Sequence, residues 1–149
     1  MCIRDRFHAP ILNLTKTTTT STVVNTSAGT TADYQIRLTN EASLGGDAQV
    51  VKITDVLPAG FTYDLGSTVF TAPATGNCLA GASRISAVNP ADGASGTITW
   101  GDWTVPAGCE VIIDFSVNIP NTVADATYDN SASVTTVTSP ATISTLMVL

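Results

Sequence analysis

Residues 51–60 read Val51-Lys52-Ile53-Thr54-Asp55-Val56-Leu57-Pro58-Ala59-Gly60, a β-branched run that stops at Pro-Ala-Gly. The same ending recurs at Pro106-Ala107-Gly108, directly before a second apolar run. Proline presets the backbone for the first corner of a tight turn, and glycine two residues later suits the exit of that turn. Extended runs that end in sharp turns predict antiparallel strands packed as a β-sandwich.

Alternation of apolar and polar residues predicts further strands on both sides of this stretch. The expected strands cover residues 9–16, 32–40, 48–57, 61–64, 67–71, 83–88, 96–100, 110–119 and 127–137, with a short strand around Val23-Val24. The turn signals between them include Gly45-Gly46 and Asn89-Pro90-Ala91-Asp92-Gly93. The fold class predicted from this pattern is all-β, a sandwich of about seven to nine strands.

Composition supports a folded domain and excludes some partners. The chain has 149 residues, of which 44% are hydrophobic and 12% are charged, with a net charge of −6. This length suits one domain with an apolar core. An acidic surface repels phosphates, which argues against nucleic acid. No apolar run approaches the ~18 residues that cross a bilayer, so we expect no membrane insertion by this segment.

The predicted domain organisation has three parts. Residues 1–8 begin Met1-Cys2-Ile3-Arg4-Asp5-Arg6, which matches the translation of a sequencing adapter; we expect a non-native leader from a metagenomic fragment, or else a short native tail. Residues 9–138 form the β-sandwich. Residues 139–149 are expected to be a linker or the truncated start of another segment.

The ordered motifs of this chain resemble the conserved repeat domain catalogued as domain of unknown function eleven. The resemblance runs from about Leu12 to Thr138 and rests on these motifs: Lys16, Tyr34-Gln35-Ile36-Arg37-Leu38-Thr39-Asn40, Ile53-Thr54-Asp55-Val56-Leu57-Pro58-Ala59-Gly60-Phe61, Ile98-Thr99-Trp100, Val105-Pro106-Ala107-Gly108 and Tyr128-Asp129-Asn130-Ser131-Ala132-Ser133-Val134. The loop with Cys78 and the matching Cys109 depart from the family pattern.

The resemblance implies an immunoglobulin-like domain, one of several in tandem, in large secreted or surface-anchored bacterial or archaeal proteins. Its implied function is non-enzymatic: a stalk or adhesin repeat of the cell envelope, exported by a signal peptide that lies outside this fragment. Its partners would be neighbouring domains of the same chain and host or envelope glycans or proteins. The alternative function is a glycan- or protein-binding adhesion module that uses its end loops and Trp103.

Three polar residues share the inward faces of three expected strands: Lys16, Asp55 and Asn130. Burial of a charge or an amide without partners costs several kcal/mol, so these side chains should meet or lie at the end of the sandwich. One hypothesis is an intramolecular isopeptide bond between Lys16 and Asn130, with a protonated Asp55 polarising the amide and relaying protons. Gram-positive surface domains of similar architecture form such bonds.

The alternative hypothesis assigns each of the three residues a local structural role. In this case Lys16 extends its amine to solvent at the sandwich edge, Asp55 caps the turn at Pro58, and Asn130 pairs with nearby backbone.

The remaining candidate residues predict little chemistry. Cys78 and Cys109 allow one disulfide, although two unpaired cysteines fit the sequence equally well. Trp103 is expected to be partly exposed, which makes it a candidate for a binding patch, whereas Trp100 belongs to the core. The single histidine, His8, leaves no Ser-His-Asp triad or histidine metal site. We therefore expect no catalytic residue, no metal and no cofactor.

Overall fold

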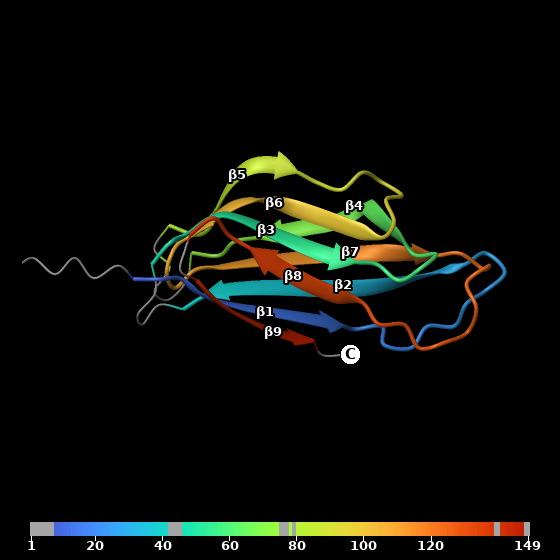
Figure 1. Ribbon diagram of the computed structural model, residues 1–149. Coiled ribbons are helices and arrows are strands. Elements are labelled where there is room, and N and C mark those ends of the chain that lie inside the picture. Colours follow the sequence, from blue (N-terminus) through green and yellow to red (C-terminus); the bar gives the residue numbers. More distant parts are fainter. Residues whose placement is uncertain (1–7, 42–45, 75–77, 79, 139–140, 148–149) are drawn as a thin grey trace, which may run out of the picture.

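The computed structural model describes residues 8–41, 46–74, 78, 80–138 and 141–147 (Figure 1). These residues form strands and no helix. The strands are β1 (Ile11–Thr18), β2 (Thr30–Asn40), β3 (Ala48–Val56), β4 (Thr62–Thr71), β5 (Ser83–Val88), β6 (Thr97–Val105), β7 (Glu110–Ile119), β8 (Ser131–Thr135) and β9 (Thr142–Met147).

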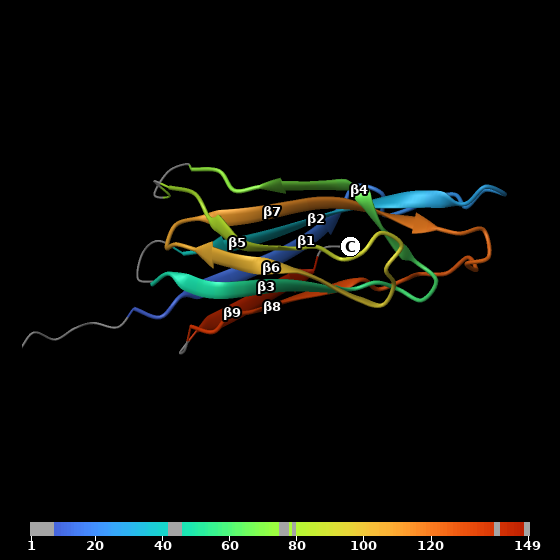
Figure 2. The ribbon, with the colours of Figure 1, turned by 90° about the horizontal axis from the view of Figure 1, so that it is seen from above.

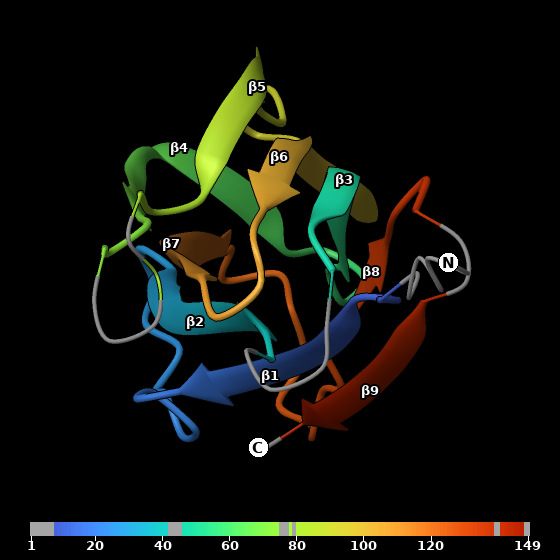
Figure 3. The ribbon, with the colours of Figure 1, turned by 90° about the vertical axis from the view of Figure 1, so that its left-hand side faces the viewer.

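The strands build two sheets packed face to face (Figures 2 and 3). One sheet has the order β4-β7-β2-β1-β9 and the other the order β5-β6-β3-β8. All strand pairs are antiparallel except β1 and β9, which run parallel. The chain is therefore the β-sandwich that the sequence predicts.

The core between the sheets forms because every second residue of a strand is buried. Strand β7 shows this most clearly, since Val111, Ile113, Phe115, Val117 and Ile119 are all buried while the residues between them are not. Side chains of a strand alternate between the two faces of its sheet, so one apolar series per strand is enough to fill the interior.

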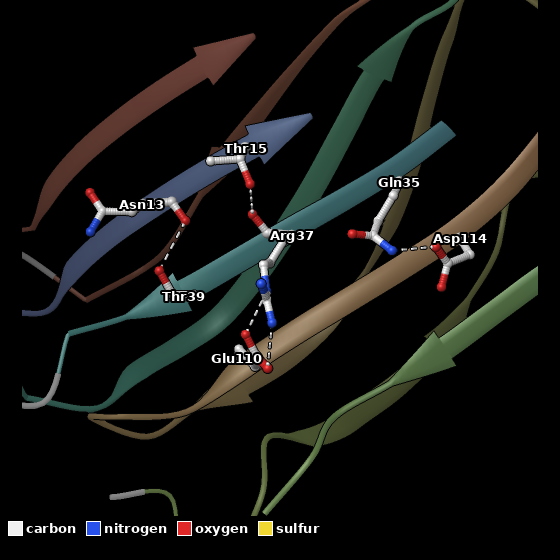
Figure 4. Close-up of polar contacts among 7 residues, drawn as sticks. All are labelled: Asn13, Thr15, Gln35, Arg37, Thr39, Glu110 and Asp114. Carbon is white, nitrogen blue, oxygen red and sulfur yellow. Dashed lines mark hydrogen bonds and ion pairs between the residues drawn. The ribbon is translucent and has the colours of Figure 1, made fainter. Parts of the chain in front are cut away.

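The outer face of the β1-β2-β7 region carries polar side chains that interact across the strands (Figure 4). Arg37 binds Glu110 through two hydrogen bonds of 2.7 and 3.1 Å. The amide of Gln35 donates to Asp114 over 2.7 Å. Such exposed cross-strand pairs contribute little stability individually, but they keep this face soluble.

The two Pro-Ala-Gly segments form turns of the same kind. Phe61 N–H donates to Pro58 C=O over 3.0 Å, and Cys109 N–H donates to Pro106 C=O over 3.0 Å. Proline therefore occupies the position before the first corner, and the expectation that it forms the corner itself is wrong. The second corner is glycine with φ of +87° at Gly60, where a residue with a side chain would be strained.

Two compensating irregularities in β3 and β6 change which side chains face the core. The register runs Ala48↔Val105, then Val51↔Trp103, then Ile53↔Trp100. Strand β3 thus has one additional residue before Val51, and β6 has one additional residue before Trp103. Val50, at the first irregularity, has a φ of +48°, which is rare for a β-branched residue.

The shift in β6 makes the expectation for Trp103 wrong. Strict alternation places Trp103 on the face opposite to Trp100 and therefore partly in solvent. With the additional residue, both tryptophans point inward, and Trp103 is only 3% exposed. Its ring packs against Phe70 at 5.8 Å and against the guanidinium of Arg84 at 5.2 Å.

Several segments differ in detail from the sequence prediction. Strand β6 continues to Val105, beyond the expected end at Trp100, and β8 covers only Ser131–Thr135 of the expected strand 127–137. The Thr- and Ser-rich segment around Val23 is a loop, because it pairs with no strand. The two short strands expected around Gly66 are one strand, β4, with a register irregularity between Asp64 and Val69. Residues 142–147, expected to belong to a linker or a new segment, form β9 along β1.

Candidate functional site

The fold brings the three inward polar residues together from both sheets. Lys16 lies near the end of β1 in one sheet, and Asp55 lies near the end of β3 in the other. Asn130 directly precedes β8, where the register pairs Asp55 with Ala132. Residues two apart on a strand share a face, so Asn130 reaches the same interior space as Asp55.

These three side chains are deeply buried. Lys16 is 3% exposed, Asp55 0% and Asn130 3%. The Lys16 ammonium forms a hydrogen-bonded ion pair with Oδ2 of Asp55 across the space between the sheets. Lys16 and Asp55 therefore meet in the interior with Asn130 beside them, one of the two placements that the sequence left open.

The polar atoms of the site are not fully satisfied. Oδ1 of Asp55 and both Oδ1 and Nδ2 of Asn130 are buried and form no hydrogen bond of proper geometry among the described residues. Burial raises the pKa of both Asp55 and Tyr34, and the Asn130 amide lies close enough to each of them to oppose part of that rise. Buried polar atoms without partners are uncommon in folded proteins and call for an explanation.

Burial moves both members of the ion pair toward their neutral forms. Loss of hydration lowers the pKa of Lys16 to about 8, although the nearby Asp55 carboxylate opposes this shift. Loss of hydration also raises the pKa of Asp55, against the opposing effect of Lys16. Burial therefore reduces the free-energy cost of passing a proton from the amine to the carboxyl.

Two aromatic rings enclose the amine. Nζ of Lys16 lies 4.5 Å from the centre of the Tyr34 ring and 5.7 Å from that of Phe115. These two rings come from neighbouring strands and stack on each other with a centroid distance of 5.6 Å. The sequence analysis did not assign them to the site. The alternating pattern placed both rings in the core but could not show which core residues lie beside Lys16.

The site lies beside a groove of about 350 Å³. Tyr34, Phe61 and Tyr128 line it together with hydroxyl-bearing residues of the segment after β1. Tyr34 also borders a second hollow of about 240 Å³, whose lining includes Asp33 and Asp114. The Tyr34 side chain is half-buried, so it stands between the enclosed site and these solvent-filled spaces.

This arrangement fits acyl transfer between two side chains. A lysine with a lowered pKa supplies a neutral amine, which is a nucleophile. An acid with a raised pKa can accept the proton of that amine and later deliver a proton to a leaving group. The side-chain amide of Asn130, next to Asp55, supplies the acyl group that would be transferred to the amine.

A disulfide joins Cys78, in the connection between β4 and β5, to Cys109, the residue directly before β7. Strands β3 and β6 are antiparallel, so the turn after Pro106 and the turn after Pro58 lie at opposite ends of the sandwich. The disulfide is therefore at one end, and the cluster of Lys16, Asp55 and Asn130 is toward the other.

Other site types are not seen in the described part of the chain. No group of three or more His, Cys, Asp or Glu residues is arranged to hold a metal ion there. No described helix is long and apolar enough to span a membrane. Most of the expected leader lies outside the described residues, and His8 at its end is exposed.

Comparison with known proteins identifies the fold. No protein-family model and no curated protein matches the sequence, so the resemblance to the repeat family is not confirmed. The structure is similar to the pilus backbone protein RrgB of Streptococcus pneumoniae, with 16% sequence identity and a TM-score of 0.52. That match covers 84% of this chain and 51% of the RrgB chain, so this chain spans about half the length of that structure.

Two further matches have lower TM-scores. The T6 backbone pilin of Streptococcus pyogenes matches at 12% identity with a TM-score of 0.49, over 83% of this chain and 28% of the pilin. The collagen-binding domain of a Staphylococcus aureus adhesin matches at 11% identity with a TM-score of 0.45, over 85% and 87% of the two chains. The fold is shown by the match to RrgB alone, as an immunoglobulin-like β-sandwich of the kind found in that pilus backbone protein.

Proposed function

We propose that this chain is a non-enzymatic structural domain of an exported cell-surface protein, a stalk or adhesin repeat locked by an isopeptide bond between Lys16 and Asn130. The observation that supports it most is the buried Lys16–Asp55 pair that spans the two sheets with the Asn130 amide beside it. A buried ion pair is weak evidence for stability by itself, because desolvation offsets much of the attraction. A reactive role explains its presence better.

The reaction needs no external reagent. The Lys16 ammonium gives a proton to the Asp55 carboxylate, and the neutral Nζ attacks Cγ of Asn130 to form a C–N bond. Asp55 then gives that proton to Nδ2, and the Cγ–Nδ2 bond breaks. The Asp55 carboxylate accepts the nucleophile's second proton as the new amide forms, and the released nitrogen departs as ammonia. The products are a secondary amide, ammonia and a protonated Asp55, so atoms and charge balance.

The position of this bond suits a domain that bears load. It would join the first strand of one sheet to the last strand of the other. Strands β1 and β9 are parallel, so the start of β1 and the end of β9 lie at opposite ends of the sandwich, where neighbouring domains of the same chain would attach. The disulfide is compatible with an oxidising compartment outside the cytoplasm.

Intact-protein mass tests the cross-link. The folded full-length protein should be lighter than its sequence by about 17 Da, the mass of the ammonia that acyl transfer to lysine releases. With the disulfide reduced in every sample, the variants Asn130→Ala and Asp55→Ala should have their full sequence masses. Lys52→Met is the matched control, since Lys52 is half-exposed and pairs with Asp102 on the outside. A folded wild-type protein of full sequence mass would end this proposal.

The alternative function, a binding module that uses its end loops and Trp103, loses Trp103 as a contact surface. A ring that is 3% exposed cannot stack on a sugar or a partner side chain without opening the core. The structural role is therefore the one we propose.

A further inference from the structure

Tyr34 occupies a special position relative to the three reactive residues. The register pairs Thr18 with Tyr34 and Lys16 with Ile36, so Tyr34 is the diagonal neighbour of Lys16 on the inner face. Its ring lies under the Lys16 amine at 4.5 Å and stacks on Phe115. Its other side borders the groove of about 350 Å³.

The hydrogen-bonding atoms of Asp55 and Asn130 indicate a role for the Tyr34 hydroxyl. One carboxyl oxygen of Asp55 is committed to Lys16, which leaves only Oδ1 for the Asn130 amide. A primary amide has both an acceptor and donors to satisfy, so one free carboxyl oxygen cannot serve its two ends. The Asn130 side chain also lies close enough to the Tyr34 hydroxyl to oppose the rise that burial causes in its pKa, as it does for Asp55.

We propose that Tyr34 is a positioning residue for the cross-linking reaction, its ring seating the Lys16 amine and its hydroxyl donating to Oδ1 of Asn130. This inference rests on the proposed function and adds Tyr34 to the three residues of its reaction centre. With the oxygen held by Tyr34, the amide nitrogen faces Asp55, which is the group that protonates it.

The hydroxyl would act as the donor to the developing negative charge. When Nζ adds to Cγ, the amide oxygen becomes an oxyanion in the tetrahedral intermediate. The Tyr34 O–H stabilises this oxygen by a hydrogen bond and keeps its proton throughout. When the Cγ–Nδ2 bond breaks, the carbonyl re-forms and ammonia departs, with the adjacent groove as the nearest solvent-filled space.

The test measures the rate of bond formation in the full chain. The protein is made in a brief cell-free translation pulse and then chased at pH values from 5 to 9, where low pH slows the reaction by protonating the amine. Samples are quenched in acidic denaturant, and the fraction that has lost about 17 Da is read from intact mass. The variants are Tyr34→Phe, which keeps the ring, and Tyr34→Leu, which removes it.

The matched control is Tyr63→Phe. Tyr63 belongs to the same aromatic cluster, with its ring 6.2 Å from that of Phe115, but its hydroxyl contacts Thr68 and Trp100 instead of the reactive residues. This control therefore loses a core hydroxyl without loss of the proposed donor.

We expect Tyr34→Phe to react at least about tenfold more slowly than the wild type at every pH, as for loss of one oxyanion donor. The midpoint of its rate–pH profile should be unchanged, because the ring still excludes water from the amine. Tyr34→Leu should be slower still, and Tyr63→Phe should react like the wild type. A purely structural effect would instead admit water and raise the midpoint toward the ordinary pKa of lysine.

The outcomes separate this inference from the proposed function. A wild-type protein that loses no mass overturns both. A wild-type protein that loses about 17 Da while Tyr34→Phe reacts at the same rate overturns the role of Tyr34 alone. A slow Tyr34→Phe whose midpoint has moved upward, or an equally slow Tyr63→Phe, also overturns it, because either result indicates loosened packing.

Discussion

Loss of the proposed Lys16–Asn130 bond should change how far the domain extends under force. Pulling on the chain ends loads β1 and the segment from Asn130 to β9. If the bond is present, force passes from Lys16 directly to Asn130, and the residues between them carry no load. In Asn130→Ala this path is broken, so the whole segment between positions 16 and 130 can unravel.

The expected extension follows from chain geometry. The segment contains about 114 residue steps, and an extended chain spans at most about 3.6 Å per residue, which gives roughly 400 Å. The disulfide holds back a loop with a sequence separation of 31, which lowers the released length to roughly 300 Å. Reduction of the disulfide should restore the missing length of about 100 Å.

Single-molecule force spectroscopy, with the domain held between two reference domains of known extension, measures these lengths. The wild type should show no unfolding step of this size at forces that unfold the reference domains. Asn130→Ala should show a step of roughly 300 Å when oxidised and roughly 400 Å when reduced. Chemical denaturation should show the same variant to be less stable by about 5 kcal/mol, from the loop-entropy estimate for a covalent link of this span.

One result would refute this reasoning. If the wild type has lost the mass of ammonia and still extends by roughly 300 Å, then the bond joins other residues or does not lie in the load path. A thermal melt of Asn130→Ala serves as the control that the variant is folded before it is pulled.

Three further predictions follow from the same packing. In Asn130→Ala, which cannot cross-link, the free energy of unfolding should rise by about 2 kcal/mol from pH 7 to pH 10. Folding lowers the pKa of Lys16 from 10.5 to about 8, so the folded state binds fewer protons than the unfolded state in that pH range. Denaturation curves at several pH values measure the rise, and Lys16→Met in the same background should remove it. Val50→Gly should stabilise the domain by about 1 kcal/mol in thermal or chemical unfolding, because glycine tolerates a φ of +48°, whereas the control Val56→Gly at a regular position of β3 should destabilise it. Reduction of the disulfide should lower the free energy of unfolding by about 3 to 4 kcal/mol, and a loss well below 1 kcal/mol would show that the loop is held by other contacts.

The sequence determined the layers of this protein and most of its strands. Two-residue periodicity is a local property of the chain, so the buried series of β7 is readable without any knowledge of its neighbours. The same periodicity placed Lys16, Asp55 and Asn130 on inward faces. It could predict that three polar groups share the interior because an isolated buried charge is too costly to persist.

Tertiary structure decided the features that depend on pairing between distant segments. Trp103 turned inward because β6 accommodates an additional residue opposite β3, and alternation within one strand contains no record of a bulge in its partner. β9 forms because β1 offers it an edge. Tyr34 and Phe115 surround the Lys16 amine because β1, β2 and β7 lie side by side, and that order of strands follows from long-range packing rather than from the residues of any one strand.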